Sequence, residues 1–289
     1  MSIRVYIDGR VREPENAMVS VFDRGFLFGD SVYETIALLG HRLIFLSEHI
    51  DRLERSALRI YLELPERSAI EQAIRETVVA TGDQDARVRV IVTRGVGAVD
   101  IDPATAKVPQ IIVIAQPLGA PTAEVLEVGV AVEMVSVSRS ASGSVSPAVK
   151  SGNYLNSVLA IAEARRRRPQ VNEAILCAGN GSVAEGATSN IFCVEQGELQ
   201  TPALEVGILD GVTRGKVLGL ARANGIAARE LSFLSPEKLR SANEAFLTSA
   251  VRGILPVTTV DGVRVGDGHP GPITRKLLDL YRRLVDEVR

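Results

Sequence analysis

The pattern of apolar and polar positions in the first 115 residues predicts short strands and two amphipathic helices. Apolar runs bounded by Asp-Gly and Gly-His turns predict strands at 5–11, 31–39, 43–45, 88–93 and 111–115. Apolar residues three and four positions apart predict a helix behind Ser47, its expected N-cap, with a stripe of Ile50, Leu53, Ala57, Leu58 and Tyr61. A second amphipathic helix is expected from Pro65 to Gly82.

The rest of the chain resumes this alternation after a stretch rich in proline and glycine. Residues 116–128 contain Pro117, Gly119 and Pro121, which is typical of an interdomain linker. Beyond it we expect strands at 129–137, 174–178, 190–195 and 244–248 and a hairpin-like stretch at 256–265. Helices are expected at 154–168, 211–224 and 270–289, the first with an inward face of Leu155, Val158, Leu159 and Ala162. Hairpin-joined strands with helices between them predict two α+β domains, 1–115 and 129–289.

The composition is that of an ordinary globular protein and narrows the classes of partner. A net charge of -2 gives no electrostatic reason to expect nucleic acid or an anionic membrane. The first residues lack the apolar segment of a signal peptide, and no apolar run has membrane-spanning length. Cys177 and Cys193 lie in apolar runs, which indicates reduced thiols of a cytoplasmic protein. The three histidines are scattered, so we expect no metal site.

Four stretches could carry chemistry, and each also has an ordinary structural interpretation. Lys150 lies in a turn of small residues, either as a surface charge or as an amine that forms a Schiff base with a carbonyl compound. Glu185 lies in a small-residue turn before a strand. Residues 207–213 form a glycine-containing turn that leads into a helix, and residues 247–253 a strand end rich in hydroxyls; both could bind an anion.

Taken together, these stretches meet the needs of one kind of cofactor. A cofactor with an aldehyde, a pyridine nitrogen and a phosphate needs an amine, an acid, and helix-end amides with an arginine. Lys150, Glu185, Val212 with Thr213, and Arg52 would supply these groups in turn.

Several motifs, in the same order along almost the whole chain, resemble those of a known family. They are Asp23 to Glu34 (DRGFLFGDSVYE), His49 to Leu53 (HIDRL), Lys150 with Asn153-Tyr154-Leu155, Glu185-Gly186 with Ser189 to Phe192, and residues 266–272. The sequence resembles the fold-type IV, class IV pyridoxal-phosphate aminotransferases, which include branched-chain and D-amino acid aminotransferases and aminodeoxychorismate lyases. The resemblance implies a two-domain fold, with a small N-terminal α+β domain and a larger, β-barrel-like C-terminal domain surrounded by helices.

The resemblance also implies the role of individual residues. Lys150 would bind the aldehyde of pyridoxal 5'-phosphate and carry the proton, and Glu185 would face the pyridine nitrogen. The implied cofactor-binding residues are Arg52, Lys150, Tyr154, Glu185, Thr188, Asn190, Leu209, Val212, Thr213 and Ser249. Those on the substrate side are Phe28, Tyr33, Arg89, Ala250 and Arg252. By the same resemblance the active site lies between the domains of a homodimer and is completed by the partner subunit.

Three departures from the family pattern bear on the substrate. Lys150 and Tyr154 are only four residues apart, one fewer than in branched-chain enzymes. Ser249-Ala250-Val251 replaces a Gly-Thr-Ala run and is followed by Arg252, which is either a carboxylate clamp or a surface arginine. The Arg-x-His pair of typical D-amino acid aminotransferases has no counterpart in residues 96–102.

These features lead to four hypotheses about function. The first is transfer of an amino group from an aliphatic, best a branched-chain, amino acid to a 2-oxo acid such as 2-oxoglutarate. The second is a D-amino acid aminotransferase that uses Arg252, and the third is a lyase of the aminodeoxychorismate type. The fourth is a binding protein without enzymatic activity, in which the lysine is incidental.

Overall fold

The computed structural model describes residues 3–139 and 146–288, which form two compact units. The first unit contains Met1–Gly119, Val149–Asn153 and Val288–Arg289. The second contains Ala120–Ala148 and Tyr154–Glu287. A five-residue segment from the middle of the chain therefore packs with the N-terminal unit.

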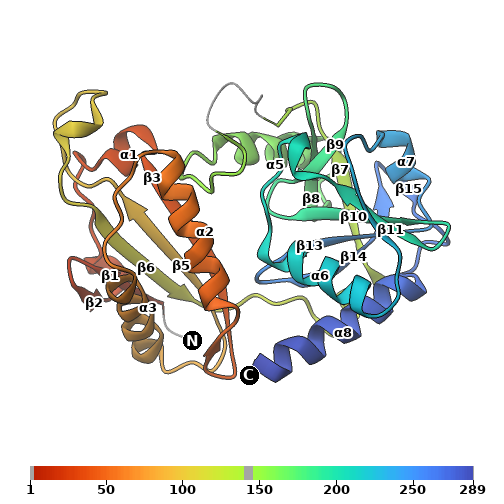
Figure 1. The fold of residues 1–289 in the computed structure, drawn as a ribbon, viewed down its shortest axis with the longest axis horizontal. Helices are drawn as coiled ribbons and strands as arrows, with labels where there is room; N and C mark the ends of the chain where they lie inside the picture. The colour runs from red at the N-terminus through yellow and green to blue at the C-terminus, as the bar shows by residue number, and fades with distance from the viewer. Residues whose placement is uncertain (1–2, 140–145, 289) are drawn as a thin grey trace. The chain divides into compact units, whose positions relative to one another are not determined.

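The first unit is an antiparallel sheet covered on one face by two helices (Figure 1). Its strand order is β2 (Arg10–Arg12), β1 (Arg4–Ile7), β6 (Gln110–Gln116), β5 (Ala86–Thr93), β3 (Ser31–Leu39) and β4 (Arg42–Leu43). Helices α2 (Leu46–Arg59) and α3 (Arg67–Thr81) share one apolar core with alternate residues of β3, β5 and β6. Because side chains alternate between the two faces of a strand, the intervening residues face away from these helices.

The start and the end of α2 differ from the sequence-based expectation. Phe45, in a left-handed conformation with φ of 54°, precedes the helix, and Ser47 lies inside it as an acceptor for Arg67. The helix ends at Arg59, so Tyr61 is 89% exposed and Leu58 is exposed as well. The predicted N-cap and the last two members of the apolar stripe are therefore wrong, because the chain turns at both ends with positive φ at Phe45 and Tyr61.

The second unit is built on one strongly curled sheet of nine strands. Its strands follow the order β12 (Ala228–Leu231), β11 (Glu198–Pro202), β10 (Asn190–Glu195), β13 (Glu244–Ser249), β14 (Gly253–Val260), β7 (Val130–Met134), β8 (Glu173–Cys177) and β9 (Val183–Gly186), with β15 (Val263–Arg264) paired to β14. The curl brings β9 into contact with β10, and one apolar core joins residues of both strands. The predicted α+β fold with a barrel-like second half is confirmed.

Among the residues that the structure describes, the second unit contains five α-helices, and one of them overturns a prediction. They are α4 (Ala123–Val128), α5 (Leu155–Arg167), α6 (Val212–Ala223), α7 (Pro236–Arg240) and α8 (Pro272–Val288). In α5 the predicted inward residues Leu155, Val158, Leu159 and Ala162 are all exposed. The helix instead buries Ser157, Ala160 and Ala164, small residues that let it lie close to β8.

Some of the remaining elements match the predictions, and others were not predicted. The hairpin around Asp261-Gly262 is present as β14 and β15. Part of the predicted linker, Ala123–Val128, is helical, because the Thr122 hydroxyl accepts a hydrogen bond from Val125 N at 3.3 Å and caps the helix. Strands β9, β11 and β12 were not predicted. Glu185, which was expected in a turn, lies in β9, because residues 183–186 pair with β8.

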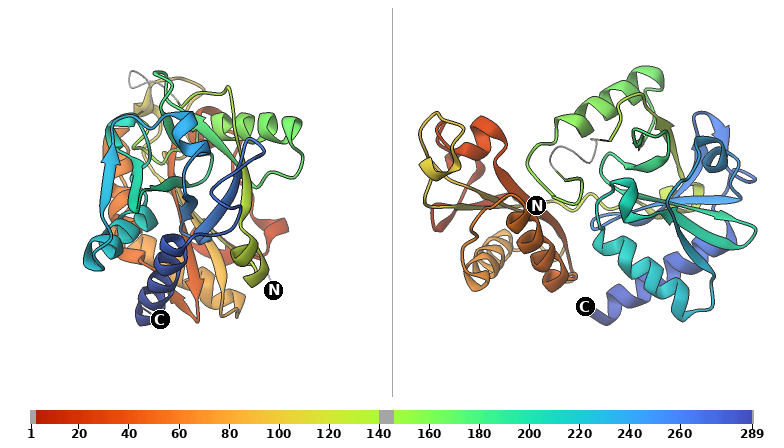
Figure 2. Two further views of the ribbon diagram at one scale, coloured as in Figure 1. Left: turned by 90° about the vertical axis from the view of Figure 1, so that its right-hand side faces the viewer. Right: turned by 45° about the horizontal axis from the view of Figure 1, so that its top comes forward.

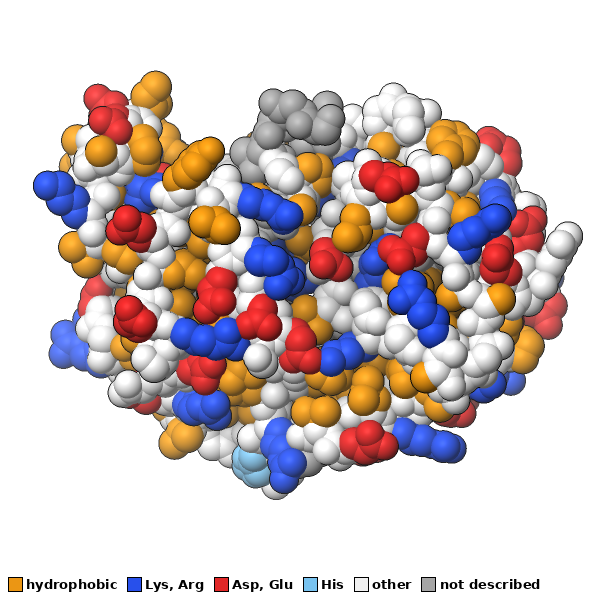
Figure 3. Space-filling model, in the orientation of Figure 1, with side chains coloured by type: hydrophobic (Ala, Val, Ile, Leu, Met, Phe, Trp, Pro, Cys, Tyr) orange, Lys and Arg blue, Asp and Glu red, His pale blue; other side chains and the backbone are white. Residues whose placement is uncertain are grey.

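The surface carries charges of both signs. Acidic and basic side chains are interspersed on the face drawn in Figure 3. In the two ranges that the structure describes, no helix combines the length and the apolar character needed to cross a membrane.

The close approach of α5 to its sheet is directly testable. We expect Ala160→Leu to destabilise the protein by about 1–3 kcal/mol, because the added atoms cannot fit between α5 and β8. Ala162→Leu makes the same change on the exposed face of the helix and should alter the free energy of unfolding by less than about 0.5 kcal/mol. Equal effects in urea denaturation would contradict this packing.

Candidate active site

Lys150 is held at the edge of the first unit's sheet. Its carbonyl oxygen accepts a hydrogen bond from Tyr33 N at 2.9 Å, and Gly152 N donates to Ser31 O at 3.0 Å. The Lys150 N–H donates to the Ser56 hydroxyl of α2 at 3.2 Å. Val149, just before the lysine, is buried in the apolar core. The backbone of this turn is thus fixed on the strand side and on the helix side.

The side chains of Lys150, Tyr33 and Arg89 come together. Lys150 Nζ lies 4.5 Å from the centre of the Tyr33 ring, and the Arg89 guanidinium carbon lies 3.9 Å from the same centre. Tyr33 in β3 and Arg89 in β5 are on the sheet face away from α2 and α3, because their neighbours in sequence face those helices. An amine, an aromatic ring and a guanidinium group therefore share one face.

Arg52 extends from α2 to β3, where it belongs to a buried polar cluster. Its Nε and one terminal nitrogen each donate to a different oxygen of Glu34, both at 2.7 Å. His49 Nδ1 lies 2.8 Å from the same carboxylate. Burial alone would raise the pKa of Glu34, but the charge and hydrogen bonds of Arg52, with the contribution of His49, lower it to about 2.

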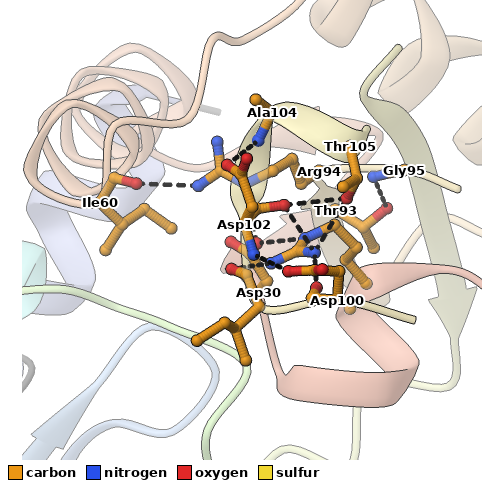
Figure 4. A network of polar contacts seen from close by, with 12 residues as sticks. Asp30, Ile60, Thr93, Arg94, Gly95, Asp100, Asp102, Ala104 and Thr105 are labelled. Carbon is orange, nitrogen blue, oxygen red and sulfur yellow. Dashed lines mark hydrogen bonds and ion pairs between the residues drawn. The ribbon is translucent and has the colours of Figure 1, made fainter. Parts of the chain in front are cut away.

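The predicted substrate residue Phe28 lies in α1 (Arg24–Phe28), close to Arg24, which belongs to a second polar network. Figure 4 shows Asp30 and Arg94 of this network. The Arg24 guanidinium carbon is 4.8 Å from the centre of the Phe28 ring. Asp30 accepts from Arg24 at 3.0 Å and from Arg94 at 2.7 Å. Burial tends to raise the pKa of Asp30, but these hydrogen bonds outweigh it and lower the pKa.

Arg24 and Arg94 also donate hydrogen bonds to the backbone of neighbouring segments. Arg94 donates to the carbonyl oxygens of Tyr61 and Ile60 at 2.7 and 2.9 Å. Arg24 donates to the carbonyl oxygens of Asp100 and Ile101. As Figures 1 and 2 show, the segment containing Pro103–Thr105 lies beside α1 as a result. These roles of Arg24 and Arg94 were not predicted, although Arg24 belongs to the first motif.

In the second unit, Glu185 is buried and has several partners. One carboxylate oxygen lies 2.8 Å from Arg139, and the other accepts from Leu209 N at 3.1 Å and from the Asn190 amide at 3.2 Å. Asn190 also donates to Leu209 O at 2.9 Å. Three predicted residues are thus in contact. Arg139 was missed, because an arginine after a strand has no sequence feature that distinguishes it from others.

Tyr154 reaches the turn that follows Glu185 despite the short spacing from the lysine. It precedes α5, and its hydroxyl donates to the Ala187 carbonyl oxygen at 3.2 Å. The departure in spacing therefore leaves its side chain at the Glu185 turn.

Helix α6 begins next to Asn190. Gly211 precedes Val212 and provides no side-chain cap for the first amides of the helix. A Cβ at Gly211 would lie 2.0 Å from Asn190 Oδ1, so a larger residue there would displace the Asn190 side chain. Thr213 is buried, and its side chain is hydrogen-bonded to Tyr281, whose pKa is raised by burial. Val212 and Thr213 together offer backbone amides and a hydroxyl at a helix N-terminus, as phosphate binding requires.

Arg252 is part of an ion pair with Glu173. The carboxylate of Glu173 is 1% exposed, and one oxygen accepts from Arg252 at 2.7 Å and from the Thr188 hydroxyl at 2.5 Å. Arg252 also donates to Thr188 at 2.7 Å and to Ser249 at 3.3 Å. The other Glu173 oxygen has no hydrogen-bond partner among the described residues. Three predicted residues, Thr188, Ser249 and Arg252, thus meet at a buried acid that sequence analysis had not singled out.

Within each unit, several of the predicted groups lie close together. The first brings an amine beside an aromatic ring and an arginine, and holds another arginine by a carboxylate. The second joins an acid, an asparagine, a tyrosine and a helix start that has no side-chain cap. These groups suit a cofactor with an aldehyde, a pyridine nitrogen and a phosphate, because the first amides of α6, which have no side-chain cap at Gly211, can donate to an anion.

Comparison with known proteins identifies a family. The family model described as amino-transferase class IV matches residues 31–260. The chain is 38% identical over 281 residues to the "Putative branched-chain-amino-acid aminotransferase" of Methanocaldococcus jannaschii, covering 97% of this chain and 96% of the relative. It is also 34% identical over 298 residues to the D-alanine aminotransferase of Listeria monocytogenes, covering 99% and 96%.

A solved structure agrees with these relatives. The branched-chain amino acid aminotransferase of Escherichia coli matches with a TM-score of 0.89 and 30% identity, over 99% of this chain and 95% of that one. The fold inferred from the sequence motifs is therefore confirmed by similarity over the whole chain.

The ion pair between Arg252 and Glu173 makes a prediction about stability. Arg252→Ala should lower the free energy of unfolding by about 2 kcal/mol, because it leaves the buried Glu173 without its cation. The double variant Arg252→Ala/Glu173→Gln should recover part of this loss, and a double-mutant cycle in urea measures the coupling. A stability unchanged by Arg252→Ala would show that the pair contributes nothing.

The buried Glu34 carboxylate makes a prediction about pH. Because its pKa is lowered from 4.5 to about 2, its contribution is fully present above pH 4.5 and is lost as the pH falls toward 2. The shift corresponds to roughly 3 kcal/mol. The difference in unfolding free energy between the wild type and Glu34→Gln should therefore be largest near pH 6 and shrink at pH 3. A difference that is the same at both values argues against an ionised, paired Glu34.

Proposed function

The chain belongs to the class IV aminotransferases, and on that premise we propose that it transfers an amino group from a branched-chain amino acid to a 2-oxo acid such as 2-oxoglutarate. The observation that carries the proposal is the fixed turn of Lys150, whose amine lies over the Tyr33 ring that Arg89 also contacts. Pyridoxal 5'-phosphate is the cofactor of this family, and the residues described above fit it.

When bound, the cofactor supplies an aldehyde and an electron-accepting ring. Lys150 Nζ would hold the cofactor through its aldehyde and, once the substrate amine has displaced it there, would serve as the base that accepts the substrate Cα proton and the acid that returns it. The hydrogen bonds on both sides of the lysine backbone fix the point from which its side chain extends, which favours proton transfer over short distances.

Glu185 would keep the pyridine nitrogen protonated. Arg139, Asn190 and the Leu209 N–H orient this carboxylate, and the Leu209 side chain would pack against the ring. Tyr154, whose hydroxyl reaches the Ala187 carbonyl oxygen, would bind the ring hydroxyl oxygen, while Thr188, which donates to Glu173, would help to brace the ring. The phosphate would be held by Arg52, the Val212 and Thr213 amides, the Thr213 hydroxyl and Ser249.

The substrate side is formed by Phe28, Tyr33, Arg89, Ala250 and Arg252. The contacts of Arg252 favour a branched-chain donor over a D-amino acid bound by this arginine, because its charge is already paired with Glu173. A D-amino acid aminotransferase is the second candidate, and the relative named D-alanine aminotransferase supports it.

We further propose a cytoplasmic homodimer whose partner subunit completes the active site. The exposed Leu155, Val158 and Leu159 on α5 provide an apolar surface for association. Cys177 and Cys193 are free thiols, and burial raises the pKa of Cys193 to about 12, which suits an unreactive thiol in a reducing compartment.

The reaction can be followed through the cofactor spectrum of the purified holoenzyme. L-leucine should convert the bound cofactor to its aminated form, D-alanine should not, and 2-oxoglutarate should reverse the change. Lys150→Ala should slow the conversion on the order of 10³-fold or more, whereas Lys107→Ala, at an exposed lysine, should have no effect.

Two outcomes would overturn the proposal in different ways. Conversion by D-alanine alone would favour the D-amino acid aminotransferase. Release of pyruvate from aminodeoxychorismate without an amino acceptor would favour the lyase.

A further inference from the structure

A buried polar stripe runs along the inner face of α2. His49, Arg52 and Ser56 lie three and four residues apart, so they are on one side of the helix. All three are buried, and the Glu34 carboxylate beside His49 and Arg52 is fully buried. Their neighbours on the helix, among them Ile50 and Leu53, belong to the apolar core.

Stability alone does not explain such a stripe of buried polar residues. Well-packed apolar residues of similar volume often stabilise a protein as much as a buried ion pair, or more. Here every member has a hydrogen-bond partner: Glu34 binds both His49 and Arg52, and Ser56 accepts from Lys150 N. A fully paired polar cluster fixes the orientation of its side chains, because hydrogen bonds are directional and apolar contacts are not.

Glu34 fixes the plane of the Arg52 guanidinium group. Two hydrogen bonds of 2.7 Å, from Nε and from one terminal nitrogen, run to separate oxygens of one carboxylate. Such a bidentate arrangement leaves the group little freedom to rotate. Glu34 also cancels the positive charge of Arg52, so the arginine acts on an anion through the direction of its donors more than through net charge.

One turn further along α2, Ser56 fixes the lysine turn. Its hydroxyl accepts the Lys150 N–H, while β3 binds the neighbouring backbone through Tyr33 N and Ser31 O. Strand β3 carries Glu34 next to Tyr33, so the same strand and helix hold both functional groups. The Arg52 guanidinium and the Lys150 backbone are thus positioned by one strand and one helix together.

We propose that Glu34 and Ser56 are positioning residues of the active site: Glu34 orients Arg52 toward the cofactor phosphate, and Ser56 holds the turn from which Lys150 reaches the aldehyde. This inference rests on the proposed binding of pyridoxal 5'-phosphate by Arg52 and Lys150. By its negative charge alone, Glu34 would repel the phosphate and weaken binding. We expect Glu34 instead to strengthen binding, because it orients Arg52.

Binding of pyridoxal 5'-phosphate and of pyridoxal to the apoenzyme separates these roles. Glu34→Gln should weaken pyridoxal 5'-phosphate roughly 10-fold while leaving pyridoxal, which lacks the phosphate, nearly unchanged. If the charge of Glu34 dominated, the variant would bind the phosphate form more tightly. Equal losses for both ligands would mean that Glu34 only supports the fold.

Arg52 variants complete this test. Arg52→Lys keeps the charge but not the bidentate geometry. It should therefore lose the preference for pyridoxal 5'-phosphate over pyridoxal. If Arg52→Lys retained that preference, the proposal would be overturned, even if Glu34→Gln failed to fold. In an Arg52→Ala background, Glu34→Gln should have no further effect on the ratio of the two affinities.

Ser56→Ala should act on the lysine alone. We expect capture of either ligand by Lys150, trapped with borohydride, to slow several-fold with no change in the ratio of the two affinities. Ser47→Ala, at an exposed serine of the same helix, is the matched control and should leave capture unchanged. Unchanged capture in Ser56→Ala would remove the role assigned to Ser56. Failure of the wild type to form a trapped adduct would instead refute the proposed function.

Discussion

The pairing of a five-residue segment with β3 is the constraint on which the first half of the site depends. Val149–Asn153 comes from the middle of the chain, yet it packs with the N-terminal unit. Backbone hydrogen bonds to Tyr33 and Ser31 set its register, and Val149 anchors it in the core. A one-residue slip along β3 would turn the lysine to the other side, so this register decides where the amine lies.

In the second unit, a buried carboxylate is likewise oriented by hydrogen bonds and an ion pair from several segments. Glu185 lies on β9 and receives Arg139, Asn190 and Leu209 from three other segments. Gly211 then lets α6 begin directly against Asn190. The acid and the helix start are therefore linked through a single asparagine. In both units a charged group is oriented by fixed hydrogen bonds, which is how a site avoids reorganisation during a reaction.

Local patterns predicted much of the fold, and chain motifs named most of the candidate residues. The strand β3, the helix α3 and the β14–β15 hairpin follow from periodicity and turn residues. The buried face of α5 did not, because small residues packed where leucine and valine were expected. Arg139 and Glu173 were missed for a different reason: their importance comes from partners that are distant in sequence, and only the folded chain brings these together.

The central claim is that Lys150, fixed between β3 and α2, is the amine that binds the cofactor. Reduction of the holoenzyme with borohydride, followed by peptide mapping, tests it most directly. The account predicts a single pyridoxyl adduct on Lys150 and none on the exposed Lys107. An adduct on another lysine, or no adduct in protein that contains the cofactor, would contradict it.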